Sequence, residues 1–424
     1  MVLGGQARRL VVVGQGYVGL PLAMRAVEVG HHVVGYDIDD ARVKSLGDGV
    51  SYVEDVPHAV LAGALRSGRY EAHSEPNRCA GFDVAVITVP TPLRDGAPDL
   101  SCIEMAGRML APLVRPGATV ILESTSYPGT TEELLAPLLA SGSGLVPGVD
   151  FCLGYSPERI DPGNRQWTFA TTPKLVSGVN ATSLRAVQDF YETMVLRTVP
   201  VSGTREAELA KLLENTFRHV NIALVNELAM FAKDLDIDIW QSIEAAASKP
   251  FGFLSFSPGP GVGGHCLPID PSYLSWRVKR TLGRPFRFVE LANDVNDHMP
   301  DYVVQRLIMG MNRRQKAING SRILLLGLAY KRNTGDARES PALHVADRLL
   351  SLGAAVYGAD PHVVEGHTDG RMSRVECMEE IDEADAVVIL TDHDAFDFQA
   401  VVARARYILD TRHCVPPGPT VEYL

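Results

Sequence analysis

The chain has 424 residues, of which 46% are hydrophobic and 21% charged, and its formal net charge is −11. This composition is typical of a soluble globular protein, and the length predicts two or three domains. The net charge argues against general nucleic-acid binding. No segment reaches about 18 uninterrupted apolar residues, so we expect no membrane span.

The N-terminal apolar run is short and leads directly into a glycine motif, which predicts a first strand rather than a signal peptide. Six cysteines are dispersed along the chain without a CxxC pair or other zinc-ligand spacing. Such dispersed cysteines fit a reducing cytoplasm and predict no metal site.

The first third of the chain alternates strand and helix patterns. Buried-strand patterns are followed by tight turns or by apolar residues at helical spacing, and this β-α-β alternation predicts a parallel, doubly wound sheet. The expected strands are 10–13, 32–37, 83–89 and 119–123, with helical patterns at 21–30 and 103–113.

A long helix is predicted from about Glu206 to Leu235, because apolar residues recur there every three or four positions. The helix packs either within its own chain or also against a second subunit, and the sequence favours neither alternative. The apolar positions are Leu209, Leu213, Phe217, Val220, Leu224, Leu228 and Phe231.

A second β-α-β pattern opens at Arg322–Gly327 and continues through a helix at 342–352 to strands at 355–359, 385–390 and 407–409. The polar stretch Asn312–Ser321 before it is the expected domain boundary. The two halves resemble each other in pattern without a sequence repeat. We therefore predict an α/β protein with two Rossmann-like doubly wound domains joined by a long central helix.

The segment Gly14–Gly19 has the GxGxxG spacing, with a strand before it and a helix after it. Glycines at these positions permit the turn and let the backbone approach a pyrophosphate at the helix N-terminus. Asp37 ends the second strand, where its carboxylate would bind the ribose hydroxyls and repel a 2′-phosphate. NAD is therefore favoured over NADP, against the alternative of a structural glycine turn with a coincidental surface aspartate.

Glycines and prolines crowd the segment Pro258–Pro271, which cannot form a regular element and therefore predicts a loop that shapes a site. Cys266 lies in this loop, and we predict that it is a nucleophile, whereas the other cysteines are expected to be small hydrophobic residues. His265 has no second ligand at zinc spacing and is expected to be structural. Asp270 either orients a water or holds the loop through local hydrogen bonds.

Over nearly its whole length the sequence resembles the UDP-glucose/GDP-mannose dehydrogenase family. The resemblance implies an NAD domain at 1–200, a central helical domain with the cysteine loop at 201–312 that dimerises, and a nucleotide-sugar domain at 313–424. It rests on GQGYVGLPLA, Val89–Pro92, Glu123–Thr131, Tyr155–Ile160, Glu208–Asn215, Asn226–Leu228, GGHCLPIDP and Gly327–Arg332.

The resemblance also implies a four-electron oxidation of a sugar CH2OH group, with two NAD consumed per sugar. Hydride loss gives an aldehyde, Cys266 adds to it, a second hydride loss gives a thioester, and water releases the acid. Lys211 and Asn215 match the family's catalytic lysine and asparagine, and their i,i+4 spacing places them on one helix face to stabilise an oxyanion. Without the resemblance, Lys211 would be read as a solvated surface charge.

Further roles are carried over from the matching motifs. Glu158 corresponds to an acid/base acting through water, Thr125 to the residue that helps hold this water, and Asp270 to the aspartate after the cysteine. The alternatives are a strand-end cap for Thr125 and a loop ion pair of Glu158 with Arg159.

The resemblance also assigns the ligand-binding residues. Lys331 and Arg338 resemble basic residues near the sugar nucleotide, where a cationic fork suits phosphate, although either could be a solvated charge. The expected cofactor site comprises Gly14, Gly16, Tyr17, Val18, Gly19, Asp37, Pro90, Thr91 and Thr125, and the expected substrate site comprises Glu158, Arg159, Lys211, Asn215, Gly263, Lys331 and Arg338.

The cysteine loop bears on the choice of sugar. The UDP-glucose branch commonly has lysine where this chain has Ile269, and the string Lys249–Phe253 with the following loop looks more like the branch acting on UDP-N-acetylhexosamines. The expected substrate is therefore UDP-glucose or a UDP-N-acetylhexosamine, with dTDP-glucose as an alternative because one methyl group discriminates weakly. A silent nucleotide-sugar sensor and a one-step hydroxyacid dehydrogenase are the rival functions.

Overall fold

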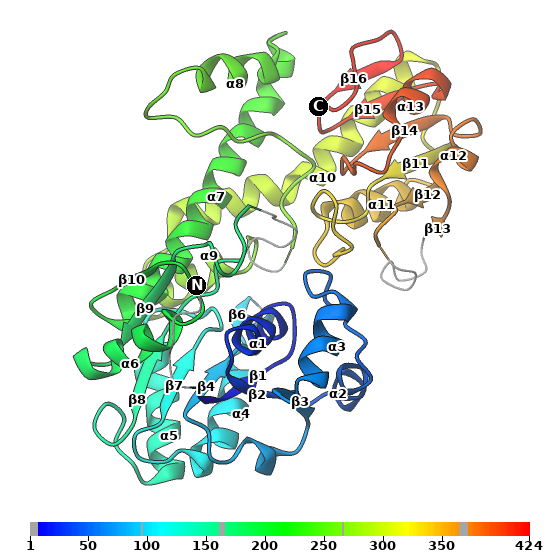
Figure 1. The fold of residues 1–424 in the computed structure, drawn as a ribbon. Coiled ribbons are helices and arrows are strands. Elements are labelled where there is room, and N and C mark those ends of the chain that lie inside the picture. Colours follow the sequence, from blue (N-terminus) through cyan, green and yellow to red (C-terminus); the bar gives the residue numbers. More distant parts are fainter. Residues whose placement is uncertain (1–6, 95, 161–165, 265–266, 364–371) are drawn as a thin grey trace. The chain divides into compact units, whose positions relative to one another are not determined.

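The structure, a computed structural model (Figure 1), describes residues 7–94, 96–160, 166–264, 267–363 and 372–424. It divides into two units, Met1–Glu214 and Asn215–Leu424. The helix α7 (Thr204–Asp234), which the apolar periodicity predicts, spans the division between the two units.

The first unit is built on an eight-stranded sheet with the order β10-β9-β8-β7-β4-β1-β2-β3. All neighbours pair parallel except β8 with β9. Alternate residues of the first strand enter two different cores, Leu10 and Val12 on one face and Val11 and Val13 on the other, so helices must cover both faces. The strands are β1 (Arg9–Val13), β2 (His32–Tyr36), β3 (Tyr70–His73), β4 (Val84–Ile87), β7 (Thr119–Leu122), β8 (Cys152–Tyr155), β9 (Lys174–Gly178) and β10 (Thr198–Pro200).

Helices follow most strands of this sheet and begin at polar caps where the sequence offers them. Asp39 caps α2 through the N–H groups of Ala41 and Arg42, and Asn180 caps α6 through Ser183. The helices are α1 (Gly19–Glu28), α2 (Asp40–Gly47), α3 (His58–Arg66), α4 (Ser101–Leu110), α5 (Ala136–Ser143) and α6 (Ala181–Tyr191), with short turns η1 (Pro76–Cys79), η2 (Ala111–Leu113) and η3 (Thr131–Leu135) and a hairpin of β5 (Leu93–Arg94) and β6 (Ala97–Pro98).

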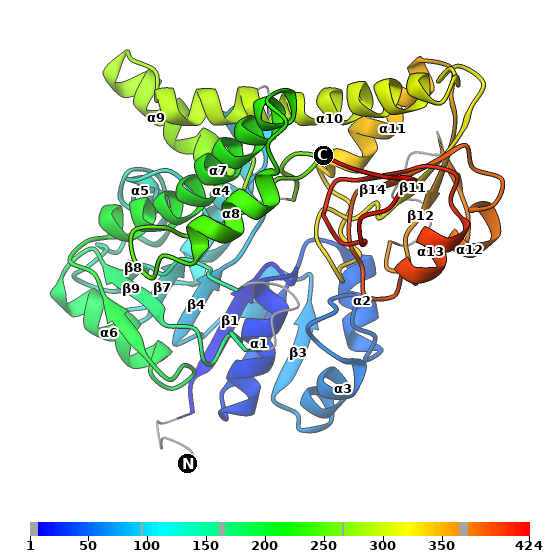
Figure 2. The ribbon, with the colours of Figure 1, turned by 90° about the horizontal axis from the view of Figure 1, so that it is seen from above.

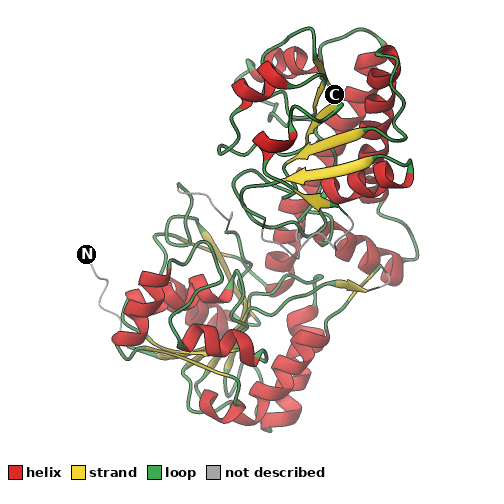
Figure 3. Ribbon diagram, turned by 90° about the vertical axis from the view of Figure 1, so that its right-hand side faces the viewer, coloured by secondary structure: helices red, strands yellow, loops and turns green. Residues whose placement is uncertain are grey.

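The second unit contains a six-stranded, wholly parallel sheet with the order β13-β12-β11-β14-β15-β16. In both sheets the first strand lies in the interior of the sheet. The second and third strands lie on one side of it, and the later strands lie on the other. Figure 3 shows helices beside these strands. The strands are β11 (Arg322–Leu326), β12 (Ala355–Ala359), β13 (Ser373–Arg374), β14 (Ala386–Ile389), β15 (Ile408–Asp410) and β16 (Val421–Tyr423).

The long helix α10 (Arg287–Arg313) contributes to the core of this second sheet. Met299, Val303, Leu307 and Met311 are buried with residues of β11 and α11, and Figure 2 shows α10 running beside α11. The other helices of the unit are α8 (Ile239–Ala247), α9 (Asp270–Leu282), α11 (Pro341–Ser351), α12 (Cys377–Glu380) and α13 (Phe398–Arg404).

The predicted fold class, two Rossmann-like domains and a long central helix, is confirmed. The segment 142–148 begins in the last turn of α5 and continues as a loop, and residues 416–419 form a loop before the edge strand β16. None of the described helices combines the length and the apolar character that a membrane span requires.

Candidate active site

The glycine turn after β1 is shaped by the chain's own packing at its first and third glycines. Gly14 has φ +93°, and a Cβ there would lie 2.8 Å from the carbonyl oxygen of Thr88. A Cβ on Gly19 would lie 1.8 Å from the carbonyl oxygen of Gly14, whereas one on Gly16 would meet nothing within 4 Å. The second glycine therefore faces open space, which is the room that an approaching pyrophosphate needs.

The residues beside this turn also suit an anionic cofactor. Val18 precedes α1 and its side chain makes no capping hydrogen bond. The N–H of Leu20 already donates to the carbonyl of Gly16 at 3.1 Å, which leaves the N–H groups of Val18 and Gly19 to face a phosphate. Tyr17 is about half exposed, Pro90 is exposed and Thr91 is buried. The residues predicted to contact NAD thus include two accessible side chains, Tyr17 and Pro90, and a buried one, Thr91.

Asp37 lies buried at the end of β2, where it is tied to the glycine turn. Its Oδ2 accepts a hydrogen bond of 2.9 Å from the backbone N–H of Gln15, and its Oδ1 accepts one of 3.0 Å from Asp39. A carboxylate oxygen can accept more than one hydrogen bond, so both oxygens keep capacity for ribose hydroxyls. Position and residual capacity therefore fit NAD.

Gln15, which sequence reasoning did not single out, anchors the turn. Its side chain is fully buried, and its Nε2 donates to the carbonyl of Val12 at 2.9 Å. Tyr70 donates to its Oε1 at 2.8 Å, and Tyr52 donates to its backbone oxygen at 2.6 Å. Burial raises the pKa of Tyr52 to about 12, so this hydroxyl remains a donor at neutral pH.

Lys211 and Glu158 are brought together at the carboxyl end of the first sheet. Lys211 is 8% exposed, and its Nζ donates to the backbone oxygen of Glu158 at 2.5 Å. The alternative of a solvated surface lysine is therefore wrong. The Glu158 carboxylate accepts a hydrogen bond from the N–H of Ile160 through Oε1, while its buried Oε2 has no hydrogen-bond partner among the described residues.

Burial raises the pKa of Glu158, and this effect outweighs the opposing influence of Lys211 and of the backbone N–H groups of Ile160 and Arg159. A carboxyl group with a raised pKa and an unsatisfied oxygen is suited to exchange a proton with a water or substrate group. The geometry therefore accommodates the acid/base role expected for Glu158. Thr125, half-buried just after β7, lies in the segment next to this strand edge.

A second buried lysine supports the same segment and was missed in the sequence. The Lys174 ammonium forms an ion pair with Glu123, and it donates to the carbonyl of Pro157 at 3.1 Å. Tyr191 donates to Oε2 of Glu123 at 3.2 Å. Burial and the nearby charge of Lys211 lower the pKa of Lys174 well below its usual value. Two lysines thus hold the successive carbonyl oxygens of residues 157 and 158.

Arg159 forms an ion pair with an acid of α7. Its guanidinium pairs with Glu214, with one N–O distance of 2.5 Å, and donates to the carbonyl of Pro173 at 2.8 Å. The alternative of a loop ion pair between Glu158 and Arg159 is therefore wrong. The role of Arg159 at the substrate remains a prediction.

In the second unit, Asn215 and Asp270 are in direct contact. The Nδ2 of Asn215 donates to Oδ2 of Asp270 at 2.5 Å, and both side chains are buried. Asp270 lies in the first turn of α9, where the helix dipole favours a carboxylate. Of its two predicted roles, the hydrogen bond observed here joins Asp270 to another helix rather than to its own loop.

Cys266, the predicted nucleophile, and its neighbour His265 lie outside the described residues, but the glycines before them are closely packed. A Cβ on Gly263 would lie 2.6 Å from the carbonyl oxygen of Glu339, and the N–H of Gly264 donates to the carbonyl of Arg338 at 3.1 Å. Only residues without a Cβ fit this contact. Gly263 and Gly264 are therefore explained by packing against the loop after β11.

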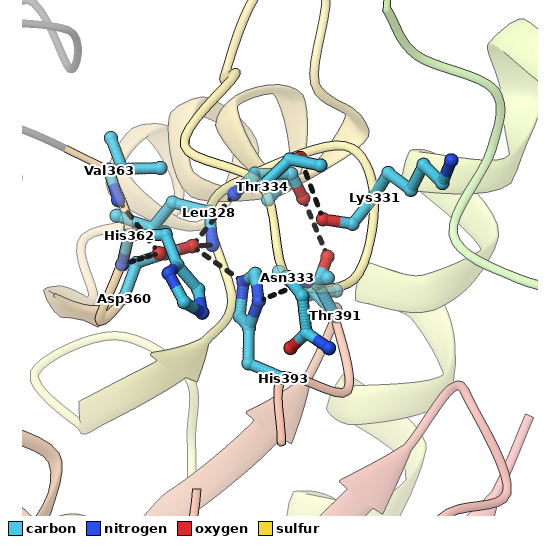
Figure 4. A network of polar contacts seen from close by, with 12 residues as sticks. Leu328, Lys331, Asn333, Thr334, Asp360, His362, Val363, Thr391 and His393 are labelled. Atoms are coloured by element: carbon cyan, nitrogen blue, oxygen red, sulfur yellow. Dashed lines mark hydrogen bonds and ion pairs between the residues drawn. The ribbon is translucent and has the colours of Figure 1, made fainter. Parts of the chain in front are cut away.

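The two basic residues predicted at the sugar nucleotide lie in this same loop after β11. Figure 4 shows the Lys331 side chain directed away from the polar network that holds its backbone. Arg338 forms a two-point ion pair with Asp336, with distances of 2.9 and 2.6 Å. This ion pair uses the Nε and Nη2 groups of Arg338, and a guanidinium has further N–H donors that suit a phosphate.

Glu208 on α7 is a buried acid that accepts three hydrogen bonds from the segment Glu123–Thr131. The N–H of Gly129 donates at 2.5 Å, and Thr131 donates through its N–H at 2.9 Å and its hydroxyl at 2.7 Å. Burial nevertheless raises the pKa of Glu208 to about 7, and the charge of Glu132 adds to this effect. The folded protein thus favours the protonated acid relative to the unfolded chain.

We expect the free energy of unfolding to fall as pH rises from about 4.5 to about 7, because the stabilisation by an acid with a raised pKa is complete below its ordinary pKa of 4.5 and is lost once the pH exceeds the pKa in the folded protein. Glu208→Gln should remove a pH-dependent component on the order of 3 kcal/mol between pH 4.5 and 8. Chemical denaturation across this range measures it, with the exposed Glu28→Gln as control. Parallel pH profiles of wild type and Glu208→Gln would contradict the prediction.

A glycine turn with room for a pyrophosphate, an acid ending the second strand and a buried lysine–glutamate pair together define an NAD-dependent dehydrogenase with two nucleotide-binding folds. Sequence profiles of the UDP-glucose/GDP-mannose dehydrogenase family match the NAD binding domain at residues 8–195, the central domain at 205–298 and the UDP binding domain at 324–417. The chain belongs to this family and is an NAD-dependent nucleotide-sugar dehydrogenase.

Individual relatives match along most of the chain. It is 35% identical to a UDP-N-acetyl-D-mannosamine dehydrogenase of Pyrococcus horikoshii over 97% of each chain. It is 37% identical to a UDP-N-acetyl-D-glucosamine 6-dehydrogenase of Pseudomonas aeruginosa over 84% of this chain and 83% of the relative.

Solved structures agree with this assignment. The fold is similar to the structure of the Pyrococcus horikoshii UDP-D-ManNAc dehydrogenase, with a TM-score of 0.89 and 34% identity over 98% of both chains. It is also similar to a UDP-glucose dehydrogenase from Pyrobaculum islandicum, with a TM-score of 0.88 and 30% identity over 100% of this chain and 98% of the other.

Proposed function

We propose that the substrate is a UDP-N-acetylhexosamine, whose C6 hydroxymethyl group is oxidised to a carboxylate. The observation that carries this proposal is the similarity, along most of the chain, to enzymes named for UDP-N-acetyl-D-mannosamine and UDP-N-acetyl-D-glucosamine. The isoleucine at position 269, where the UDP-glucose branch commonly has lysine, supports the same choice. UDP-glucose is the second candidate, because the chain is also similar to a solved UDP-glucose dehydrogenase.

The residues divide the chemistry between them. NAD, when bound, accepts the hydride in each of the two oxidations. The Cys266 thiolate adds to the C6 aldehyde carbon, which converts the carbonyl oxygen to an oxyanion and holds the sugar as a thiohemiacetal. Lys211 and Asn215 stabilise this oxyanion by charge and by hydrogen bonding.

Release of the product requires water to attack the thioester. The buried Oε2 of Glu158, which has no hydrogen-bond partner in the part of the chain that the structure describes, and the raised pKa of this acid support a role in taking a proton from that water. Thr125 helps hold the water, and Asp270 orients Asn215 through their hydrogen bond of 2.5 Å. The C–S bond then breaks, the thiolate leaves, and the uronic acid is released.

We assign the functional regions as an NAD domain at 1–200, a central helical domain at 201–312 and a nucleotide-sugar domain at 313–424. The matched family segments begin and end near these limits. A reducing, cytoplasmic compartment suits Cys266, because the proposed nucleophile must remain a free thiol. Lys331 and Arg338 would bind the anionic part of the sugar nucleotide.

We also propose that the chain forms a homodimer through α7. Five of the seven apolar residues predicted on this helix are exposed, and they recur on one face at helical spacing, which a soluble chain buries by association. They are Leu209, Leu213, Phe217, Leu224 and Phe231, with exposed fractions of 43%, 62%, 45%, 52% and 47%.

Sedimentation equilibrium should give twice the mass of the chain for the wild type. Leu213→Glu should shift the distribution toward monomer, because it places a charge in the apolar face. Leu196→Glu is the matched control, since Leu196 is equally apolar and exposed but lies outside α7. A monomeric wild type, or equal behaviour of the two variants, would exclude this interface.

The substrate is tested by NADH formation with NAD and separate samples of UDP-N-acetylmannosamine, UDP-N-acetylglucosamine, UDP-glucose and dTDP-glucose. We expect the highest kcat/KM with one UDP-N-acetylhexosamine, two NADH per sugar and a uronic acid in the mass spectrum of the product. Preference for UDP-glucose or dTDP-glucose would overturn the proposed sugar. Binding of a nucleotide sugar without turnover of any would instead support the silent sensor.

A further inference from the structure

The second Rossmann-like sheet has an acid, Asp360, at the position that Asp37 occupies in the first, at the end of the second strand. The two acids bind differently. Whereas Oδ2 of Asp37 accepts one backbone N–H, Oδ2 of Asp360 accepts two, from Leu328 at 2.7 Å and Ala329 at 2.9 Å. The Asp360 carboxylate is also fully buried.

The other oxygen of Asp360 is equally engaged. Its Oδ1 accepts hydrogen bonds from the N–H groups of His362 at 2.8 Å and Val363 at 3.0 Å. Burial alone would raise the pKa of Asp360, but hydrogen bonds from His393 and the backbone outweigh it and hold the pKa far below its usual value. The acid therefore stays ionised and serves its own chain rather than a ribose.

His393, which is fully buried, links this acid to the loop after β11. Its Nε2 lies 3.0 Å from Oδ2 of Asp360, and its Nδ1 lies 2.9 Å from the backbone nitrogen of Asn333. Since the Asn333 N–H can only donate, Nδ1 must accept and Nε2 must carry the proton toward the carboxylate. His393 is thus a neutral bridge with a defined tautomer, and Figure 4 shows it between Asp360 and Asn333.

The bridge acts on a short segment that is fixed at several points. Asn333 has φ +56° and exchanges two hydrogen bonds with Asp394, of 2.6 and 3.0 Å. The Thr391 hydroxyl donates to the carbonyl of Ala329 at 2.6 Å, and the Thr334 hydroxyl donates to that of Lys331 at 3.1 Å. These bonds hold the backbone on both sides of Lys331, while its side chain leads away from the network.

We propose that His393 is a positioning residue for nucleotide-sugar binding: by accepting the Asn333 N–H while donating to Asp360, it fixes the loop that presents Lys331 to the anionic part of the substrate. The inference rests on the proposed function, because it requires that Lys331 meets the sugar nucleotide. It does not place His393 in contact with the substrate.

Two substitutions separate the two hydrogen bonds of His393. In His393→Asn, the side-chain oxygen occupies the place of Nδ1 and keeps the acceptor for Asn333, but no group reaches Asp360. In His393→Gln, the side-chain nitrogen occupies the place of Nε2 and keeps the donor to Asp360, but the acceptor for Asn333 is lost. The exposed His298→Asn is the matched control.

We expect His393→Gln to raise KM for UDP-N-acetylglucosamine roughly tenfold, as loss of one buried hydrogen bond predicts, with KM for NAD unchanged. His393→Asn should stay within about threefold of wild type in both constants. In amide hydrogen exchange, the peptide containing Asn333 should lose protection in His393→Gln and keep it in His393→Asn. This pattern supports the inference, since a merely structural role would not move one KM alone.

Equal KM values for the sugar nucleotide in both variants, or equal exchange rates at Asn333, would overturn the inference. A wild-type protein that turns over none of the sugar nucleotides would refute the proposed function instead. Exchange at Asn333 can still be measured in that case and decides separately whether His393 holds the loop.

Discussion

Cys266→Ser should lower steady-state NADH formation by roughly 10⁴-fold or more and should stop release of the uronic acid. A serine hydroxyl is far less nucleophilic than a thiolate at neutral pH. It therefore cannot trap the aldehyde efficiently for the second oxidation. Spectrophotometry of NADH and mass spectrometry of the sugar product measure the two effects together.

A second cysteine variant controls for the loss of any thiol. Cys102 is a half-buried free cysteine on α4, and we expect Cys102→Ser to retain turnover near the wild-type rate. Normal output of both NADH and acid from Cys266→Ser would refute the covalent mechanism. Equal loss in the two variants would point to an effect of thiol removal on the fold.

Local patterns in the sequence were sufficient for the sheets and for the cofactor turn. A strand whose alternate residues enter two cores reads as an unbroken apolar run, as in Arg322–Leu326, so both first strands were recognised. The glycine turn was also predicted, because its residue types follow from backbone conformation and close approach. Such features depend on neighbours along the chain.

Contacts between residues distant in sequence were not predictable in this way. The ion pair of Lys174 with Glu123 joins the first residue of β9 to the residue that follows β7, and nothing adjacent to either residue predicts its partner. Similarly, Asp37 and Asp360 each follow the second strand of their sheet. Oδ2 of Asp37 accepts a hydrogen bond from one backbone N–H, whereas Oδ2 of Asp360 accepts hydrogen bonds from two. Only the folded backbone distinguishes an acid that can meet a ligand from one that holds a loop.

The apolar stripe on α7 illustrates a third limit. Periodicity predicted the helix correctly, but it could not say which face the chain would bury. In the structure Leu212 and Ala229 are buried, whereas Leu213 and Phe217 are exposed. An apolar helical face signals burial in the final assembly, and a single sequence does not state whether the covering surface belongs to the same chain.

Lys211→Met should lower kcat by about 10²–10³-fold, the usual effect of removing one group that stabilises an oxyanion. The Nζ of Lys211 donates to the backbone oxygen of Glu158 at 2.5 Å, so its loss also removes the charge that opposes the raised pKa of this acid. The pKa of Glu158 should then rise further. If Glu158 must be ionised to take a proton from water, the acid limb of the kcat profile moves to higher pH.

Measurement of kcat and of both KM values across pH separates this effect from a loss of cofactor binding. KM for NAD should stay unchanged, because the glycine turn and Asp37 do not contact Lys211 through any hydrogen bond between described residues. Lys279→Met, which removes an exposed lysine of α9, is the matched control and should leave kcat unaltered. A kcat that is unchanged in Lys211→Met would show that the buried lysine supports only the backbone of residue 158 and takes no part in the chemistry. An acid limb that does not move would show that the charge of Lys211 does not set the pKa of Glu158.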